Sequence, residues 1–258
     1  MVLTARASKL NLERRPIQKW GAVSLFLIAG LFPAITSAEP LKAFNAEFNV
    51  HALGMKLGVS KHSLRCEQEN CTLKAISKPQ GLAKLLLNES SEETIKLKQS
   101  YNQFKWLAYQ KKVGKDLSDP KNLKVDTFFI NDKQPAEIVN PAKQKSWPVQ
   151  AEVYDSLSLA YAVQFNVLNQ KPLNALFLQE SKRQQAMTFN TGFSEVDLKL
   201  DNGKTLKKTQ LFQFKTEKTN VKIWLLPTYD YFPARVDVYN IKKDKTLTLL
   251  LQEPPKIL

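Results

Sequence analysis

The sequence has very few of the residues on which most catalytic and metal sites depend. Of its 258 residues, two are cysteine, two are histidine and eight are glycine. The glycines form no Walker loop and no Gly-x-Gly-x-x-Gly pattern, and there is no Gly-x-Ser-x-Gly elbow. The two histidines, His51 and His62, lack the His-Glu-x-x-His spacing of a zinc site. We therefore expect no catalytic residue, no metal and no cofactor.

The two cysteines lie close together in the chain. Cys66 and Cys71 are separated by the polar stretch from Glu67 to Asn70, between two segments that are typical of strands. A hairpin would place them opposite each other, so we expect a disulfide formed in an oxidising compartment. A redox-active pair is the alternative. It is disfavoured because the spacing is not Cys-x-x-Cys and no helix N-terminus follows to lower a thiol pKa.

Residues 1–38 are typical of an export signal. Basic residues up to Lys19 precede an apolar run from Gly21 to Leu31, and the small residue Ala38 suits cleavage after it. The apolar stretch is shorter than the roughly 20 residues of a membrane-spanning helix. We therefore expect a cleaved signal peptide and a mature periplasmic protein, residues 39–258, that forms a single β-rich envelope domain.

The rest of the chain is basic, and it is apolar enough to build a core. The whole sequence has a formal charge of +14 and is 43% hydrophobic. From residue 39 onward, 33 basic and 23 acidic residues leave a net charge of +10. Many lysines, such as Lys242 and Lys243, fall in predicted turns, where charge discourages edge pairing. The alternative is attraction to anionic envelope material such as lipid phosphates. No nucleic acid is expected as a partner, because no nucleic-acid-binding module is recognisable.

Alternating apolar residues predict many short strands. The segment from Phe44 to Leu53 alternates strictly, and Asn202-Gly203 favours a hairpin turn. In the segment 104–109, we expect Phe104, Trp106 and Ala108 on the inner face. The stretch 131–148 carries three prolines, so it is predicted to be a long loop.

One helix is predicted near the middle of the chain. Asp155 or Ser156 can cap its first turn, and Leu157, Tyr161 and Phe165 recur along one face, which is the pattern of an amphipathic helix over residues 155–168. Strands are predicted on both sides of it. The expected fold class is mainly β, with a curled antiparallel sheet, half-barrel-like, wrapped around one principal helix.

The helix and a short apolar segment after Gly81 suggest a site for an apolar ligand. The candidate lining residues are Leu82, Leu85, Leu86, Leu157, Tyr161, Phe165 and Trp224. Arg235 is a candidate anion contact, because a guanidinium suits phosphate or carboxylate. The alternative for this region is a structural hairpin in which Arg235 forms an ion pair with Asp230.

Three motifs resemble those of the exported bacterial family called domain of unknown function 3108. They are Gly54-Met-Lys-Leu-Gly58, Asp155-Ser-Leu-Ser-Leu-Ala-Tyr161 and the block Trp224-Leu-Leu-Pro-Thr-Tyr-Asp230-Tyr-Phe-Pro233-Ala-Arg235-Val. The likeness extends from about Phe44 to Gln252. It implies an exported, β-rich envelope protein and brings no activity or catalytic residue with it. The cysteine pair and the high lysine content depart from a typical member.

Three functions are therefore considered. The first is a non-enzymatic protein that binds or carries a lipid-like or other apolar ligand, which predicts an apolar cavity between helix and sheet. The second is a structural or interaction protein of the envelope with a solid core and a basic face. The third is a hydrolase of envelope polymer, which needs two titratable side chains converging in a cleft. We rank them in this order.

Overall fold

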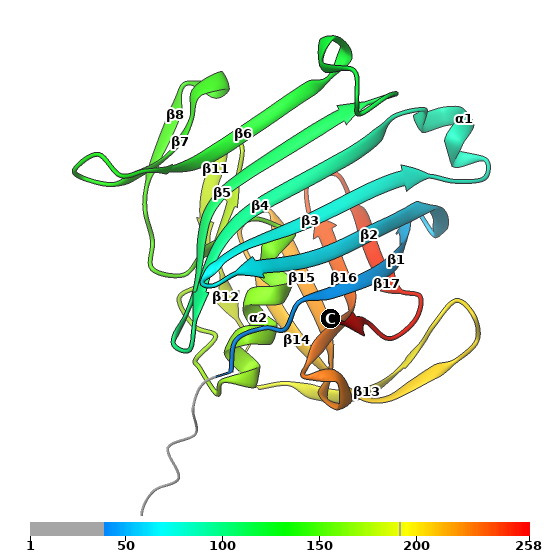
Figure 1. The fold of residues 1–258 in the computed structure, drawn as a ribbon. Coiled ribbons are helices and arrows are strands. Elements are labelled where there is room, and N and C mark those ends of the chain that lie inside the picture. Colours follow the sequence, from blue (N-terminus) through cyan, green and yellow to red (C-terminus); the bar gives the residue numbers. More distant parts are fainter. Residues whose placement is uncertain (1–38, 191) are drawn as a thin grey trace, which may run out of the picture. The chain divides into compact units, whose positions relative to one another are not determined.

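The computed structural model describes residues 39–190 and 192–258, so the predicted signal peptide lies outside the described residues. The described elements belong to one compact unit, Ser37–Leu258, and are mostly strands (Figure 1). The helices are α1 (Ala83–Leu87) and α2 (Ser158–Leu168), and the strands are β1 (Phe44–Ala52), β2 (Met55–Glu67), β3 (Asn70–Pro79), β4 (Ser90–Ser100), β5 (Gln103–Gly114), β6 (Lys124–Asn131), β7 (Glu137–Asn140), β8 (Lys145–Pro148), β9 (Val153–Tyr154), β10 (Phe177–Glu180), β11 (Arg183–Ala186), β12 (Thr188–Phe189), β13 (Ser194–Lys199), β14 (Thr205–Lys215), β15 (Thr219–Leu226), β16 (Phe232–Asn240), β17 (Lys245–Leu251) and β18 (Lys256–Ile257).

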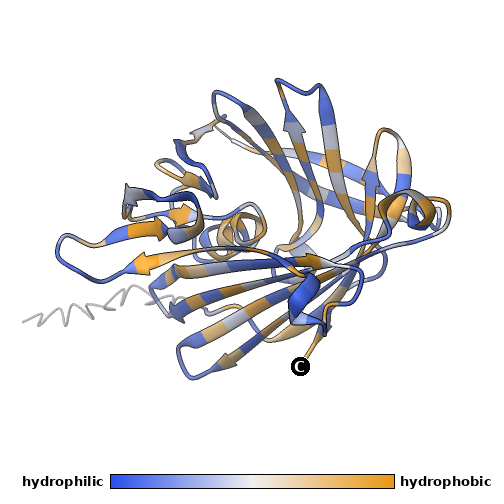
Figure 2. Ribbon diagram, turned by 90° about the horizontal axis from the view of Figure 1, so that it is seen from above, coloured by the Kyte–Doolittle hydropathy of each residue, from blue (hydrophilic) through white to orange (hydrophobic). Residues whose placement is uncertain are grey.

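Within the described residues, one 15-stranded sheet makes up most of the unit. Its order is β12-β14-β15-β16-β17-β1-β2-β3-β4-β5-β6-β7-β8, with β13 beside β14 and β18 beside β1. All of its strand pairs are antiparallel. The sheet curls around α2 and does not close on itself (Figure 2). The expected fold class, a curled antiparallel sheet around one principal helix, is confirmed.

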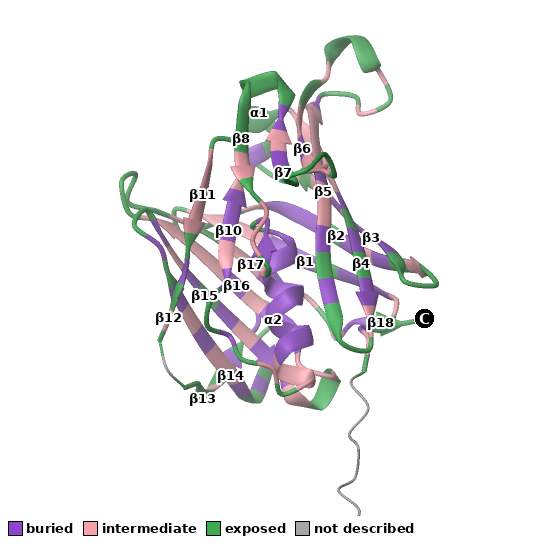
Figure 3. Cartoon of the chain, turned by 90° about the vertical axis from the view of Figure 1, so that its left-hand side faces the viewer, coloured by how far each residue is buried: buried purple, intermediate pink, exposed green. Residues whose placement is uncertain are grey.

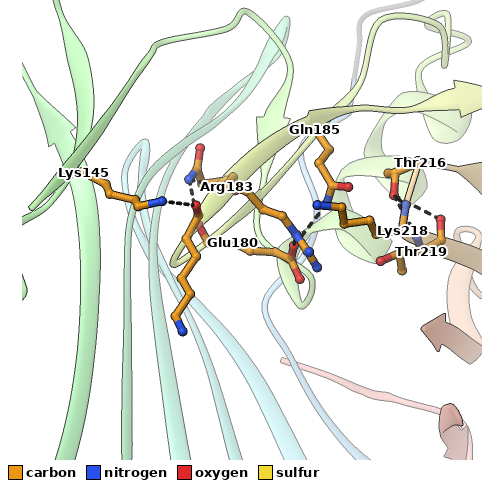
Figure 4. A network of polar contacts seen from close by, with 9 residues as sticks. Lys145, Glu180, Arg183, Gln185, Thr216, Lys218 and Thr219 are labelled. Carbon is orange, nitrogen blue, oxygen red and sulfur yellow. Dashed lines mark hydrogen bonds and ion pairs between the residues drawn. The ribbon is translucent and has the colours of Figure 1, made fainter. Parts of the chain in front are cut away.

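A second sheet of three strands lies beside β8 at one end of the large sheet. Its order is β11-β10-β9, and β9 pairs with β10 in parallel; this small sheet was not predicted. Side chains join this sheet to β7 and β8. Asn140 donates to the Ser181 carbonyl at 3.1 Å. Lys145, labelled in Figure 4, donates to the Lys182 carbonyl at 3.3 Å. The two sheets are therefore joined here by side-chain hydrogen bonds in place of a strand ladder.

Helix α2 is more deeply enclosed than its sequence pattern predicts. Every residue from Ser158 to Asn166 is buried, including the polar Gln164 and Asn166, so the helix has no solvated face along that stretch (Figure 3). The large sheet covers one side of it, and the small sheet covers another. An amphipathic helix was expected. The difference arises because the curled large sheet and the three-stranded sheet together surround the helix, whereas a flat sheet would cover it on one side only.

Aromatic contacts fix α2 against the inner face of the sheet. The Tyr161 ring stacks on Phe44 at a centroid distance of 5.2 Å, and the Phe165 ring stacks on Phe104 at 5.6 Å. All four rings are buried. Large apolar rings buried in this way dominate the stability of a core.

The stretch 131–148, predicted to be a loop, instead contains the hairpin β7–β8. Its three prolines do not interrupt the ladder, because Pro135 lies in a turn, Pro141 starts a 3-10 turn and Pro148 ends the edge strand β8. Proline is tolerated at such positions because no ladder hydrogen bond is lost there.

The prediction that Ala108 faces inward is wrong. Phe104 and Trp106 are buried as expected, but the register shifts between Lys96 and Leu97 of the partner strand. One extra residue on β5 reverses the alternation of sides. Tyr109, and not Ala108, is therefore the next buried residue.

The predicted disulfide is confirmed. Cys66 and Cys71 are directly paired across the β2–β3 hairpin and are joined by a disulfide bond.

Candidate functional site

A cavity of about 280 Å³ lies inside the curl of the sheet, next to the start of α2. It has an apolar wall, a polar wall and a floor. The apolar wall consists of Val50, Val236, Val238, Leu247 and Leu249; the polar wall contains Ser60, His62, Ser77, Ser91, Glu93 and Lys111; the floor is made by Ser156 and Leu157. Its volume is close to the lower limit for small-molecule sites.

Strand register explains why the walls differ in character. Val236 pairs with Leu249 and Val238 with Leu247, so the inward positions of β16 and β17 form one apolar surface. On β2, β3 and β4, Ser60 pairs with Ser77 and Ser77 with Ser91, which places three hydroxyls in a row. A ligand in this cavity would contact hydrocarbon on one side and hydroxyl groups on the other.

A buried chain of hydrogen bonds links the polar wall to α2. The Tyr161 hydroxyl is 2.8 Å from His62 Nδ1, His62 Nε2 is 3.0 Å from Ser60 Oγ, and Ser60 Oγ is 2.8 Å from Ser77 Oγ. Burial lowers the pKa of His62 to about 3, so the imidazole is neutral at physiological pH. Burial also raises the pKa of Tyr161, which keeps its hydroxyl protonated.

This chain is poorly suited to activate a nucleophile. A serine hydroxyl beside a histidine is the pairing of many hydrolases, in which a third group orients the histidine. Here the third group is the neutral Tyr161 hydroxyl, and a histidine with a pKa of about 3 is a weak base. The chemistry that these residues support best is polar contact with a neutral group.

Glu93 and Lys111 supply the charges of the polar wall. Lys111 Nζ lies 2.8 Å from Glu93 Oε1, and the Tyr109 hydroxyl donates to Glu93 Oε2 at 2.9 Å. Burial, followed by the nearby Glu93 carboxylate, raises the pKa of Tyr109, so this donor stays protonated. The side chain of Lys111 is 39% exposed and that of Glu93 only 17%, so Lys111 is the charge that a ligand could reach.

Below the floor, Asp155 fixes the first turn of α2. Its Oδ1 accepts hydrogen bonds from the backbone N–H groups of Leu157 and Ser158, and its Oδ2 accepts from the Ser158 hydroxyl at 2.6 Å. The predicted cap is thereby found at Asp155. Burial raises the pKa of this carboxyl, and the hydrogen bonds from Ser158 and Leu157 oppose that rise.

The predicted lining residues do not come together in one place. Leu157 and Tyr161 lie beside the cavity and a small adjoining pocket, whereas Phe165 is deeper in the core. Leu82 is exposed directly before α1, Leu85 is exposed on α1, and Leu86 belongs to the same helix. Trp224 lies on the outer face of β15, between the inward Ile223 and Leu225.

The predicted ion pair between Arg235 and Asp230 does not form. Asp230 pairs with Lys42 at 2.9 Å, while Arg235 makes two hydrogen bonds of 2.8 Å to Asp237 and stacks over Trp224. Asp237 lies two residues along the same strand, so both side chains project from one face. Arg235 also lines a shallow outer pocket of about 500 Å³ that contains His51, Asp201 and Lys199.

Sequence reasoning missed Ser60, Ser77 and Ser91. The available signal was a set of polar residues at inward positions of strands that otherwise alternate, as in Val59-Ser60-Lys61-His62. Only the register between strands shows that these positions form one row.

The two histidines lie on opposite faces of the sheet. His62 faces the core, whereas His51 lies on the outer face, 2.8 Å from Asp201. Across residues 39–190 and 192–258, no three histidine, cysteine or acidic side chains gather as a metal site. Over the same residues, neither helix is long and apolar enough to cross a membrane.

The fold and the cavity define an open, curled-sheet protein with an internal helix. No protein-family model and no curated protein matches the sequence. Among solved structures, the fold is similar to the crystal structure of a beta-barrel-like protein of domain of unknown function DUF1849 from Brucella abortus. The TM-score is 0.52 at 9% identity, and the match covers 84% of this chain and 98% of that chain. This similarity shows the fold alone.

Proposed function

We propose that the protein is a non-enzymatic envelope protein that binds a lipid-like or other apolar ligand in the cavity above α2. The supporting observation is the cavity of about 280 Å³. Its apolar wall, which includes Val50, Val236 and Leu249, faces a row of serine hydroxyls. Such a site suits a molecule with a hydrocarbon part and a small polar part, since each would meet a matching wall. Leu247 and Lys111 are partly exposed, so the cavity is open to solvent on that side.

The proposal includes export to the periplasm and membership of the family called domain of unknown function 3108. Export is supported by residues 1–38 of the sequence, and the family by the three motifs. Intact-mass measurement of the protein from the envelope fraction tests export. A mature chain that begins at Glu39 is expected, and a retained N-terminus would contradict cleavage.

Ligand binding is tested by mass spectrometry of lipid extracted from natively purified protein, together with titration of a dansyl-labelled fatty acid. The variant Val238→Trp fills the cavity and is expected to weaken probe binding about tenfold or more. Lys222→Trp is the matched control, because Lys222 is exposed on the outer face of the neighbouring strand. Equal binding by both variants, or no co-purified lipid and no probe binding, would contradict the proposal.

A basic interaction surface is the second candidate. The observation that favours it is the excess of lysines over acidic residues in the turns at one end of the large sheet.

A further inference from the structure

Five connections lie together at one end of the large sheet. Strand register places them there: β1 meets β2 at Ala52 and Met55, β3 meets β4 at Ser77 and Ser91, and β16 meets β17 at Asn240 and Lys245. At the same end, β5 meets β6 at Val113 and Lys124, and β14 meets β15 at Lys215 and Asn220. We call this end the rim, and it comprises residues 53–56, 78–89, 114–124, 215–219 and 240–247. The cavity residues Lys111, Val238 and Leu247 lie next to it or within it.

Most of the large apolar side chains that are exposed belong to the rim. Leu82, directly before α1, and Leu85 on α1 are 82% and 81% exposed, and Leu53 and Met55 at the β1–β2 turn are 64% and 60% exposed. Helix α1 contacts β2, so these two groups are neighbours (Figure 1). An exposed apolar group of this kind marks an interaction surface more often than a scatter of single residues does.

The β1–β2 turn holds a leucine in a backbone conformation that disfavours it. Leu53 has a φ of +53° and is followed by Gly54 at +74°. Two-residue turns with positive φ at both positions favour Asn, Asp or Gly, and a leucine there is unfavourable. The leucine is nevertheless present and 64% exposed, so neither turn preference nor core packing accounts for its apolar side chain.

The rim also carries more than half of the net positive charge. Its five segments contain eleven lysines and five acidic residues, a net charge of +6 out of the +10 found from residue 39 onward. Lys56, Lys78 and Lys84 flank the exposed leucines and are themselves exposed, and none of the three forms a salt bridge with another described residue.

We propose that the rim docks onto the surface of a bilayer that contains anionic lipid, with Leu53, Met55, Leu82 and Leu85 entering the interface and the surrounding lysines contacting lipid phosphates. Apolar side chains that project from separate turns, interspersed with lysines, match a soft anionic surface. The inference goes beyond ligand binding and does not depend on it, because it concerns the surface and not the cavity.

The test is vesicle co-sedimentation of the unit Ser37–Leu258. This unit holds the whole described core, and it omits the apolar segment Gly21 to Leu31, which would bind vesicles by itself. We expect it to bind phosphatidylcholine vesicles that contain about 30% phosphatidylglycerol. Binding should fall about tenfold on phosphatidylcholine alone or in about 1 M salt.

Two double variants decide whether the rim is the docking surface. Leu82→Glu with Leu85→Glu is expected to lower vesicle binding about tenfold or more, because it removes apolar area and adds negative charge. Tyr101→Glu with Ile257→Glu is the matched control: these side chains are 64% and 47% exposed at the opposite end of the sheet, and binding should be unchanged. Thermal unfolding checks that both variants fold.

Several results would overturn the inference. One is that the unmodified protein does not bind anionic vesicles. Another is that the two double variants lose vesicle binding to the same extent. A dimer in light scattering that the Leu82→Glu, Leu85→Glu variant separates would assign the surface to a second copy. The cavity variant Val238→Trp should bind vesicles normally, so failure of the ligand proposal and failure of the docking proposal can be told apart.

Discussion

The carboxylate of Asp155 accepts a hydrogen bond of 2.9 Å from the indole N–H of Trp106. Both residues are buried, Asp155 in the turn that begins α2 and Trp106 on strand β5. The same carboxylate caps the first turn of the helix through Leu157 and Ser158. One side chain therefore sets both where the helix starts and where it meets the sheet.

Replacing this carboxylate should be strongly destabilising. We expect Asp155→Ala to lower the free energy of unfolding by about 3 kcal/mol, because it removes the helix cap and leaves the Trp106 N–H buried without a partner. Urea unfolding measures the change. Asp132→Ala is the control, since Asp132 is exposed, and it should change stability by no more than about 0.5 kcal/mol. A loss for Asp155→Ala as small as that of the control would contradict the role given to Asp155.

His62 should make the protein less stable in acid. Between its ordinary pKa of 6.5 and its folded value of about 3, the unfolded chain binds a proton that the folded protein does not. Stability therefore falls as pH falls through this window, by about 1.4 kcal/mol per pH unit from this group. The free energy of unfolding of the unmodified protein, relative to that of His62→Gln, should fall by roughly 2–3 kcal/mol between about pH 6.5 and about pH 4.5.

Tyr161→Phe is the control for that measurement. It removes the hydrogen-bond partner of His62 Nδ1 but keeps the histidine buried, so the dependence on pH should remain. The raised pKa of the Asp155 carboxyl acts in the opposite direction in all three proteins and cancels in the comparison. Parallel pH curves for the parent and His62→Gln would show that His62 is not held neutral.

Gly58 is required because two backbones approach each other closely there. A Cβ atom at this position would lie 2.2 Å from the Lys78 carbonyl oxygen of the neighbouring strand. Gly58→Ala should therefore lower the free energy of unfolding by about 2 kcal/mol. Gly54→Asn provides the comparison, because Gly54 has a positive φ and open space around it, and asparagine tolerates that conformation. Equal effects of the two substitutions on urea unfolding would contradict this reading.

The disulfide should contribute a modest amount of stability. Cys66 and Cys71 close a loop with a sequence separation of only 5, so the unfolded chain loses little freedom when they are joined. Reduction, or substitution of both by serine, should cost about 2 kcal/mol. Guanidinium unfolding with and without reductant measures this difference. A loss of folding on reduction would mean that the bond does more than close the hairpin.

The local pattern was sufficient to predict most of the long strands, the cysteine hairpin and the position of the central helix, but not the hairpin β7–β8. Alternation from Phe44 onward, the Asn202-Gly203 turn and the cap at Asp155 are each decided by a few neighbouring residues. Such short-range preferences can be read directly from a sequence. The fold class followed, because strands on both sides of one helix leave few ways to bury it.

Tertiary structure alone decided which residues line the cavity. The inward side of β5 changed at an extra residue that no local pattern indicated, so Tyr109 took the place predicted for Ala108. Ser60, Ser77 and Ser91 became one polar row only through the register of three strands, and Leu82 and Leu85 proved to be surface residues at the rim. The physical reason is that a strand's alternation defines two faces but not which of them is inside, and pairing between distant segments makes that choice.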